Sequence, residues 1–125
     1  MKTVQILDYS AEFQAHFKQL NLEWMQQFRT NTARQSILED PKTHIIDKGG
    51  FIFFAEIDGK IVGTSALLRE SHKIYEIADM AVTPQYQGKH IGKSLLQKSI
   101  DVLIDLGEAQ SSGRTLALDR LLGLI

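Results

Sequence analysis

The residues best suited to chemistry lie between Ala81 and Ser94, where a predicted strand runs through a glycine-containing loop into a predicted helix. The first turn of a helix carries N–H groups without partners and a partial positive charge. A glycine such as Gly88 lets the backbone approach an anion that a Cβ would block. Lys89 and Lys93 add positive charge nearby. The stretch therefore predicts a phosphate or diphosphate site; the alternative is an ordinary strand–turn–helix junction with solvated lysines.

Two nucleotide motifs compete for this stretch. Gly92-Lys93-Ser94 matches the end of a P-loop, G-x-x-x-x-G-K-S/T, but the first glycine of that pattern falls on Gln87. P-loops also lie in parallel sheets, whereas an antiparallel meander is predicted before this loop. The dinucleotide fingerprint G-x-G-x-x-G fails because Gly88 and Gly92 do not have its spacing. A P-loop phosphotransferase is therefore a minor alternative.

Composition excludes several other classes of protein. The 125 residues fit one domain, and 14 basic residues against 15 acidic ones give a net charge of −1. This balance argues against binding to nucleic acid and to membrane surfaces. The chain has no cysteine, which excludes disulfides, thiolate metal sites and cysteine nucleophiles. The four histidines show no metal-binding spacing, and the N-terminus has no apolar signal segment, so we expect no metal and a cytoplasmic protein.

The first half of the chain is predicted to be mainly helical. A short strand is expected at 3–8, and Ser10 offers an N-cap to a helix with one apolar face. The residues of that face are Phe13, Phe17, Leu20, Trp24 and Phe28. One or two short helices are expected within 31–48, broken near Asp40-Pro41 and ended by Gly49-Gly50.

The second half predicts the strands that position the loop. Asp58-Gly59 is a strong hairpin signal, and Thr83-Pro84 ends the last strand before the loop. A helical period begins at Ile91 and is closed by Gly107, and a last strand is expected at Thr115–Leu118. The three strands of the meander are expected at 51–57, 60–68 and 74–82. The fold class is therefore α/β (α+β), with helices packed on a mostly antiparallel mixed sheet.

At the loop, the sequence resembles the GNAT N-acetyltransferase family. Gln87 to Gly92 fits the acyl-coenzyme A loop Q/R-x-x-G-x-G/A, except that His90 replaces the middle glycine. We expect His90 to have ordinary helical geometry, because a histidine adopts positive φ only with strain. The resemblance covers most of the chain, through Leu22-Glu23-Trp24, Phe51 to Glu56, Gly59 to Thr64, Tyr75 to Val82 and Pro84 to Gly92.

The resemblance implies the GNAT-like acyl-CoA N-acyltransferase fold and acetyl-CoA as cosubstrate. It implies that the pantetheine arm lies along the strand ending at Val82 and that a backbone N–H there polarises the thioester. The cofactor-binding residues so implied are Met80, Ala81, Val82, Gln87, Gly88, Lys89, His90, Ile91, Gly92, Lys93 and Ser94. The implied reaction is direct attack of a primary amine, from a small molecule or a protein, on acetyl-CoA.

Glu76 is the candidate general base. It lies eleven positions before Gln87, the spacing of the catalytic glutamate in some branches of the family. A carboxylate with a pKa near about 4.3 is a weak base, so Glu76 would act best if partly buried or through a water relay. The alternatives are a surface strand residue or an anchor for the substrate amine.

The C-terminus departs from the family pattern. No tyrosine follows Tyr86, and the family's Asn…Ala…Tyr…Gly-Phe segment is missing. We expect a single domain over 1–125 with this segment missing or altered, so that the acid for the thiolate is either missing or replaced by water. The unfinished sheet edge favours a homodimer. A catalytically weak GNAT-fold module that binds acyl-CoA, with a binding or regulatory role, is therefore the alternative function.

Overall fold

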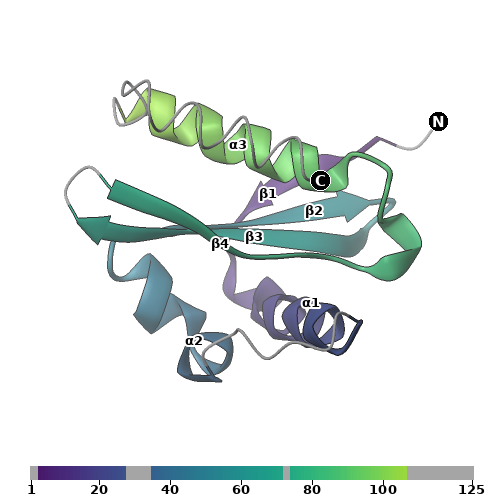
Figure 1. The fold of residues 1–125 in the computed structure, drawn as a ribbon, viewed down its shortest axis with the longest axis horizontal. Helices are drawn as coiled ribbons and strands as arrows, with labels where there is room; N and C mark the ends of the chain where they lie inside the picture. The colour runs from purple at the N-terminus through teal and green to yellow at the C-terminus, as the bar shows by residue number, and fades with distance from the viewer. Residues whose placement is uncertain (1–2, 28–34, 72–73, 107–125) are drawn as a thin grey trace.

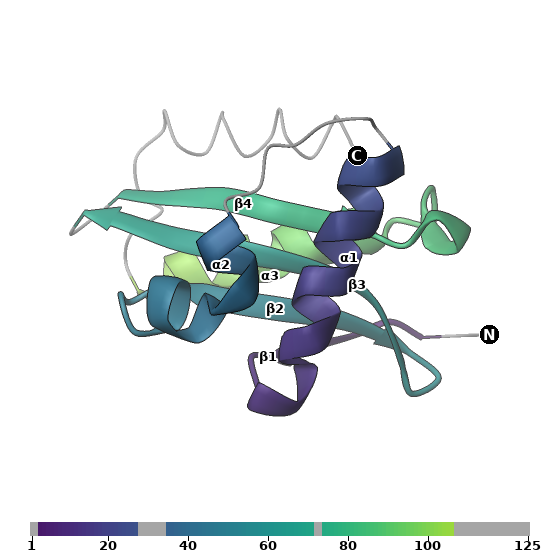
Figure 2. The same ribbon diagram turned by 90° about the horizontal axis from the view of Figure 1, so that it is seen from below.

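The structure is a computed structural model that describes residues 3–27, 35–71 and 74–106. Helices α1 (Gln14–Gln27) and α2 (Gln35–Glu39) cover one face of a four-stranded antiparallel sheet, and α3 (Ile91–Asp105) covers the other (Figure 1 and Figure 2). We call these the α1/α2 face and the α3 face. The strands, in their order across the sheet, are β1 (Gln5–Asp8), β2 (Phe51–Ile57), β3 (Lys60–Ser71) and β4 (Ile74–Val82). The predicted fold class is confirmed.

The hairpin between β2 and β3 forms where the sequence predicts it. Asp58 and Gly59 have φ angles of 51° and 79°, which is the left-handed pair that a two-residue turn needs to match the twist of its strands. Ile57 pairs with Lys60 directly across this turn. The turn sets the register of the meander, and this register brings the start of β3 beside the end of β4.

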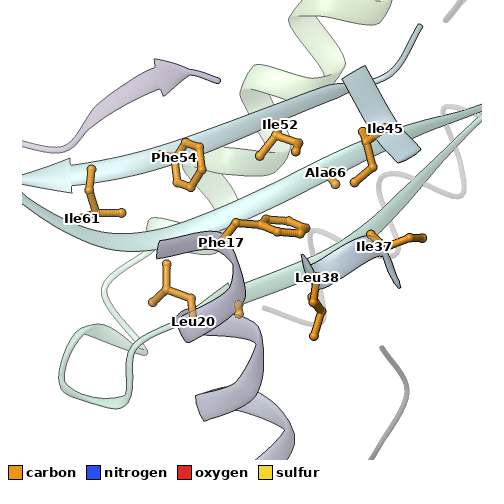
Figure 3. Packing of buried hydrophobic residues seen from close by; sticks show 10 residues of the cluster. Phe17, Leu20, Ile37, Leu38, Ile45, Ile52, Phe54, Ile61 and Ala66 are labelled. Atoms are coloured by element: carbon orange, nitrogen blue, oxygen red, sulfur yellow. The ribbon is translucent and has the colours of Figure 1, made fainter. Parts of the chain in front are cut away.

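The apolar stripe of α1 forms part of the core on the α1/α2 face. Phe17 is fully buried and Leu20 is 5% exposed, while Phe13 and Trp24 pack at the margin. Figure 3 shows Phe17 and Leu20 in one cluster with Phe54 of β2, together with Ile37 and Leu38 of α2. The predicted stripe is confirmed for these residues, and Phe28 lies outside the described residues.

The segment between α1 and β2 also follows the prediction. The chain breaks near Asp40-Pro41, after α2, and continues as a π-helical turn over Lys42–Ile46. Gly50 then enters the sheet in close contact with β3: an added Cβ would lie 2.4 Å from the carbonyl oxygen of Leu67. Glycine is required here because a backbone carbonyl cannot move aside.

The α3 face is closed by the apolar side of α3. Ile91, Leu95 and Leu103 are buried there against residues of β2 and β3. Gly63 of β3 permits the close approach, since a Cβ at this position would meet Ile91 Cγ2 at 3.2 Å. The helix therefore begins and packs where its period predicts. The predicted stop at Gly107 and the predicted strand at Thr115–Leu118 lie outside the described residues.

Ser10 lies at the predicted N-cap position, but the predicted side-chain cap is absent. Ser10 has the extended backbone of a cap, but its hydroxyl makes no capping hydrogen bond. Its carbonyl oxygen instead accepts a hydrogen bond from the N–H of Phe13, 2.9 Å away, which starts a 3₁₀ turn over Ala11–Phe13. The tight turn uses the backbone of Ser10 rather than its side chain.

Candidate functional site: the β4–α3 loop and the edge of β4

The loop from β4 to α3 lies at one end of the sheet (Figure 1). Thr83 leaves β4 and donates its N–H to the carbonyl of Val62, 2.9 Å away, which keeps the start of the loop on the sheet. A 3₁₀ turn over Pro84–Tyr86 follows, and Gln87 returns to an extended conformation. The next three residues, Gly88, Lys89 and His90, are exposed and lead into α3.

Backbone donors converge where α3 begins. The first amide of the helix with a backbone acceptor is that of Ser94, which donates to the His90 carbonyl at 3.1 Å. The N–H groups of Ile91, Gly92 and Lys93 precede it and therefore have no acceptor within the helix. His90 supplies no side-chain capping bond to them. These donors, at the positive end of a 15-residue helix, suit an anion.

Gly88 leaves space beside these donors. Its φ is +78°, and a Cβ built on it would meet nothing within 4 Å. The amides of Gly88, Lys89 and His90 make no backbone hydrogen bond to any residue that the structure describes. The loop thus presents further N–H groups next to an open volume.

Lysine side chains give this corner positive charge. The Nζ of Lys89 lies 5.4 Å from the centre of the Tyr86 ring, and the Nζ of Lys60, from the start of β3, lies 5.8 Å from it. Lys93 is exposed in the first turn of α3. The sequence identified Lys89 and Lys93 but not Lys60, which only the register of the hairpin brings here.

The prediction for His90 is wrong. Its φ and ψ are 65° and 18°, so it has the left-handed conformation of the glycine that it replaces rather than helical geometry. The reason is the direction of the chain: Gly88 and His90 both turn left-handed so that the loop can reverse into α3. The strain of about 1 kcal/mol or more is tolerated because the surrounding turn fixes the conformation.

A bulge interrupts β4 near the loop. Thr64 pairs with Ala81 and Ala66 pairs with Ala78, so one residue of β3 faces two of β4, Asp79 and Met80. Asp79 has a φ of 52°, the left-handed value of the first residue in this type of bulge. The sequence analysis missed the bulge; the signal was an aspartate inside an apolar strand, since Asp tolerates this conformation better than most residues.

The predicted strand residues of the site are Met80, which is part of the bulge, and Ala81 and Val82, which follow it. Ala81 is buried, whereas Met80 and Val82 are half-buried. Among the described residues, β4 is one of the two edge strands of the sheet and pairs only with β3. Its backbone at Met80–Val82 therefore lies on an open edge that leads directly into the loop.

Glu76 lies further back along β4, and its side chain is exposed. It pairs with Leu68, whose side chain packs into the core on the α1/α2 face. Cross-strand partners point to the same side of a sheet, so the Glu76 carboxylate also lies on the α1/α2 face. Asp79, where the bulge begins, lies three positions further along the chain, a distance of about 10 Å along a strand.

The described part of the chain has neither a metal-ligand cluster nor a membrane-spanning helix. No group of three or more histidine, aspartate or glutamate side chains is arranged there to hold a metal ion. None of the helices within 3–27, 35–71 and 74–106 combines the length and apolarity needed to cross a membrane.

Comparison with solved structures identifies the fold. An acetyltransferase of the GNAT family from Staphylococcus aureus superposes with a TM-score of 0.76 and 24% identity, over 85% of this chain and 69% of that one. An IAA acetyltransferase from Bacillus cereus gives a TM-score of 0.64 and 27% identity, over 94% and 74%. A GNAT family acetyltransferase from Brucella melitensis in complex with acetyl-CoA gives 0.71 and 19%, over 85% and 71%.

Sequence comparison agrees with the structural one. No protein of curated function matches the chain significantly. Residues 10–112, however, match the family model described as the acetyltransferase (GNAT) family, and this range includes both the loop and the edge of β4. The chain therefore belongs to the acetyltransferase (GNAT) family.

Proposed function

We propose that this protein transfers the acetyl group of acetyl-CoA to a primary amine of a small molecule or a protein. The family supports an acyltransferase, and similar structures contain acetyl-CoA or coenzyme A. The observation that carries the proposal is the set of N–H groups from Gly88 to Lys93, which have no backbone acceptor among the described residues. A Cβ built on Gly88 would meet no atom within 4 Å, so this part of the loop is open.

The residues of the loop fit the diphosphate of coenzyme A. In this proposal, backbone N–H groups from Gly88 to Lys93 donate to its oxygens, and Lys89 and Lys93 offset its charge. The Ser94 hydroxyl is excluded from this role in its observed position, because it donates to the His90 carbonyl at 3.1 Å. Ser94 therefore contributes as part of the helix start and not through its side chain.

The open edge of β4 fits the pantetheine arm, whose amides can hydrogen-bond a strand as an added strand does. Bound there, acetyl-CoA supplies a thioester whose acyl carbon accepts the amine nitrogen as the thiolate leaves. The bulge at Asp79 and Met80 turns the backbone of β4 just where the strand meets the loop. We infer that a backbone N–H of Met80, Ala81 or Val82 donates to the thioester oxygen.

Glu76 removes the proton that the amine must lose. An alkylammonium group has a pKa of about 10.4, so most of the amine is protonated at neutral pH. The distance of about 10 Å between Glu76 and the bulge exceeds a direct hydrogen bond, so water molecules relay the proton to the carboxylate. The exposure of Glu76 on the α1/α2 face supports entry of the amine from that side.

Two measurements test the proposal. Isothermal titration calorimetry with coenzyme A, acetyl-CoA and ATP should show binding of the first two only. A thiol-release assay with acetyl-CoA and a panel of primary amines should then show turnover. Binding of ATP with magnesium in place of coenzyme A would overturn the proposal in favour of a phosphotransferase.

A second function has specific support from the site. Glu76 is far from the bulge, and a histidine replaces the middle glycine of the loop. Both features would suit a module that binds acyl-CoA with little or no turnover. The same two measurements separate the functions: tight binding of acetyl-CoA without thiol release, over the whole amine panel, would identify the binding module.

A further inference from the structure

The side chain of Gln87 joins the loop to two other elements. Its Nε2 donates to the carbonyl oxygen of Val82, at the end of β4, over 2.9 Å. It also donates to Oε1 of Gln27, the last residue of α1, over 3.0 Å. Gln27 Nε2 returns a hydrogen bond of 3.1 Å to Gln87 Oε1. The two amides thus form a reciprocal pair between positions 60 residues apart.

This pattern leaves Gln87 without a donor for a ligand. A glutamine amide has two N–H donors, and both are used, one for β4 and one for α1. We propose that Gln87 does not bind the diphosphate through its side chain, and that Gln27 is a positioning residue that holds the loop ready for coenzyme A. The inference rests on the proposed function and adds a residue outside the loop motif.

The position of Gln87 explains why such a support matters. It immediately precedes Gly88 and lies three positions before His90. The left-handed conformations of these two residues reverse the chain into α3. A loop that is ordered before binding loses less conformational entropy when a ligand arrives. The pair at Gln27 supplies part of this order from outside the loop.

The pair also connects the two sides of the proposed reaction. Helix α1 packs against β3 and β4 on the α1/α2 face, where the Glu76 carboxylate lies. The loop between β4 and α3 lies past the end of β4 and leads to the α3 face (Figure 1). The Gln27–Gln87 pair therefore links helix α1, on the face that carries Glu76, with the loop proposed to hold the cofactor.

A mutant cycle on the dissociation constant of coenzyme A tests the inference. Q27A should weaken binding by about three- to tenfold, the range for an exposed pair of hydrogen bonds. Q26A, an exposed glutamine one position earlier on α1, is the matched control and should bind as the wild type does. In Q27A/Q87A the loss should equal that of Q87A alone. Losses that multiply, or equal binding by Q27A and Q26A, would overturn the inference.

Replacing the amide pair by an ion pair distinguishes positioning of the loop from a direct charge effect on the diphosphate. In Q27E/Q87R, the introduced guanidinium can donate two parallel hydrogen bonds to the introduced carboxylate and still has N–H donors left for the Val82 carbonyl. Q27E/Q87R should therefore bind coenzyme A about three- to tenfold more tightly than Q27A/Q87R. The added carboxylate would by itself repel the diphosphate, so a gain isolates the pair. Weaker binding by Q27E/Q87R would contradict the inference.

The ligand-free protein provides an independent readout. The ¹⁵N relaxation order parameters of Gly88 and Lys89 should fall in Q27A and not in Q26A. Unchanged order parameters would overturn the positioning role whatever the cofactor. A fall in order together with no coenzyme A binding by the wild type would instead overturn the proposed function and leave the positioning role standing.

Discussion

Glu76 pairs with Leu68 across the β3–β4 ladder, and this pairing places the candidate base on the α1/α2 face, opposite to α3. The carboxylate is exposed and about 10 Å from the bulge along the strand. A base that works through water at this distance raises the rate without holding the cofactor. The proposed roles of proton acceptor and cofactor site therefore fall on different parts of β4.

Glu76→Gln should lower kcat by about tenfold or more, because the amide cannot take the proton of the amine. The dissociation constant of coenzyme A should change less than twofold. Thiol release with the fastest amine of the panel measures the first value, and calorimetry the second. Glu70→Gln, at an exposed glutamate of β3, is the matched control. A kcat for Glu76→Gln equal to that of the control would remove Glu76 from the reaction.

Gly88→Ala tests whether the glycine is needed for stability, for binding of coenzyme A, or for both. Gly88 and Gly59 have nearly equal φ angles, 78° and 79°, and a Cβ on either meets nothing within 4 Å. Alanine at either position should cost about 1 kcal/mol or more of unfolding free energy, because positive φ strains an L side chain. Urea denaturation measures this cost.

The two alanine variants should differ in binding. Gly88→Ala should weaken coenzyme A by about tenfold or more, since its Cβ occupies the space beside the loop amides. Gly59→Ala, in the β2–β3 hairpin, should bind as the wild type does. Equal affinities for the two variants would place the cofactor elsewhere.

His90→Gly should stabilise the protein by about 1 kcal/mol, because glycine adopts the observed φ of 65° without strain. His90→Val should destabilise it, since a β-branched side chain resists that conformation. The free energy of unfolding in urea provides the comparison. Lower stability of His90→Gly than of the wild type would mean that the imidazole contributes more than its backbone costs.

The sequence predicted regular elements well and the irregular points poorly, for a physical reason. The stripe through Phe17 and Leu20, and the turn at Asp58-Gly59, are local patterns that one segment specifies by itself. The role of Gln27 cannot be predicted from its own segment, because its partner Gln87 lies 60 residues away and contacts it only in the folded chain. The backbone conformation of His90 does not follow from the preference of histidine itself, because the surrounding loop requires a left-handed residue at this position.

The bulge of β4 is the last feature open to a direct test. Asp79 has a φ of 52° inside a strand, so the side chain at this position must tolerate a left-handed backbone. Asp79→Asn should keep the bulge, whereas Asp79→Val should cost about 1–3 kcal/mol more or shift the register of β4. A shift would turn Met80 and Val82 to the other face and misplace the edge that leads into the loop. Asp79→Val should therefore weaken coenzyme A as well as lower the midpoint of unfolding. Equal midpoints and affinities for the two variants would show that the bulge does not depend on this residue.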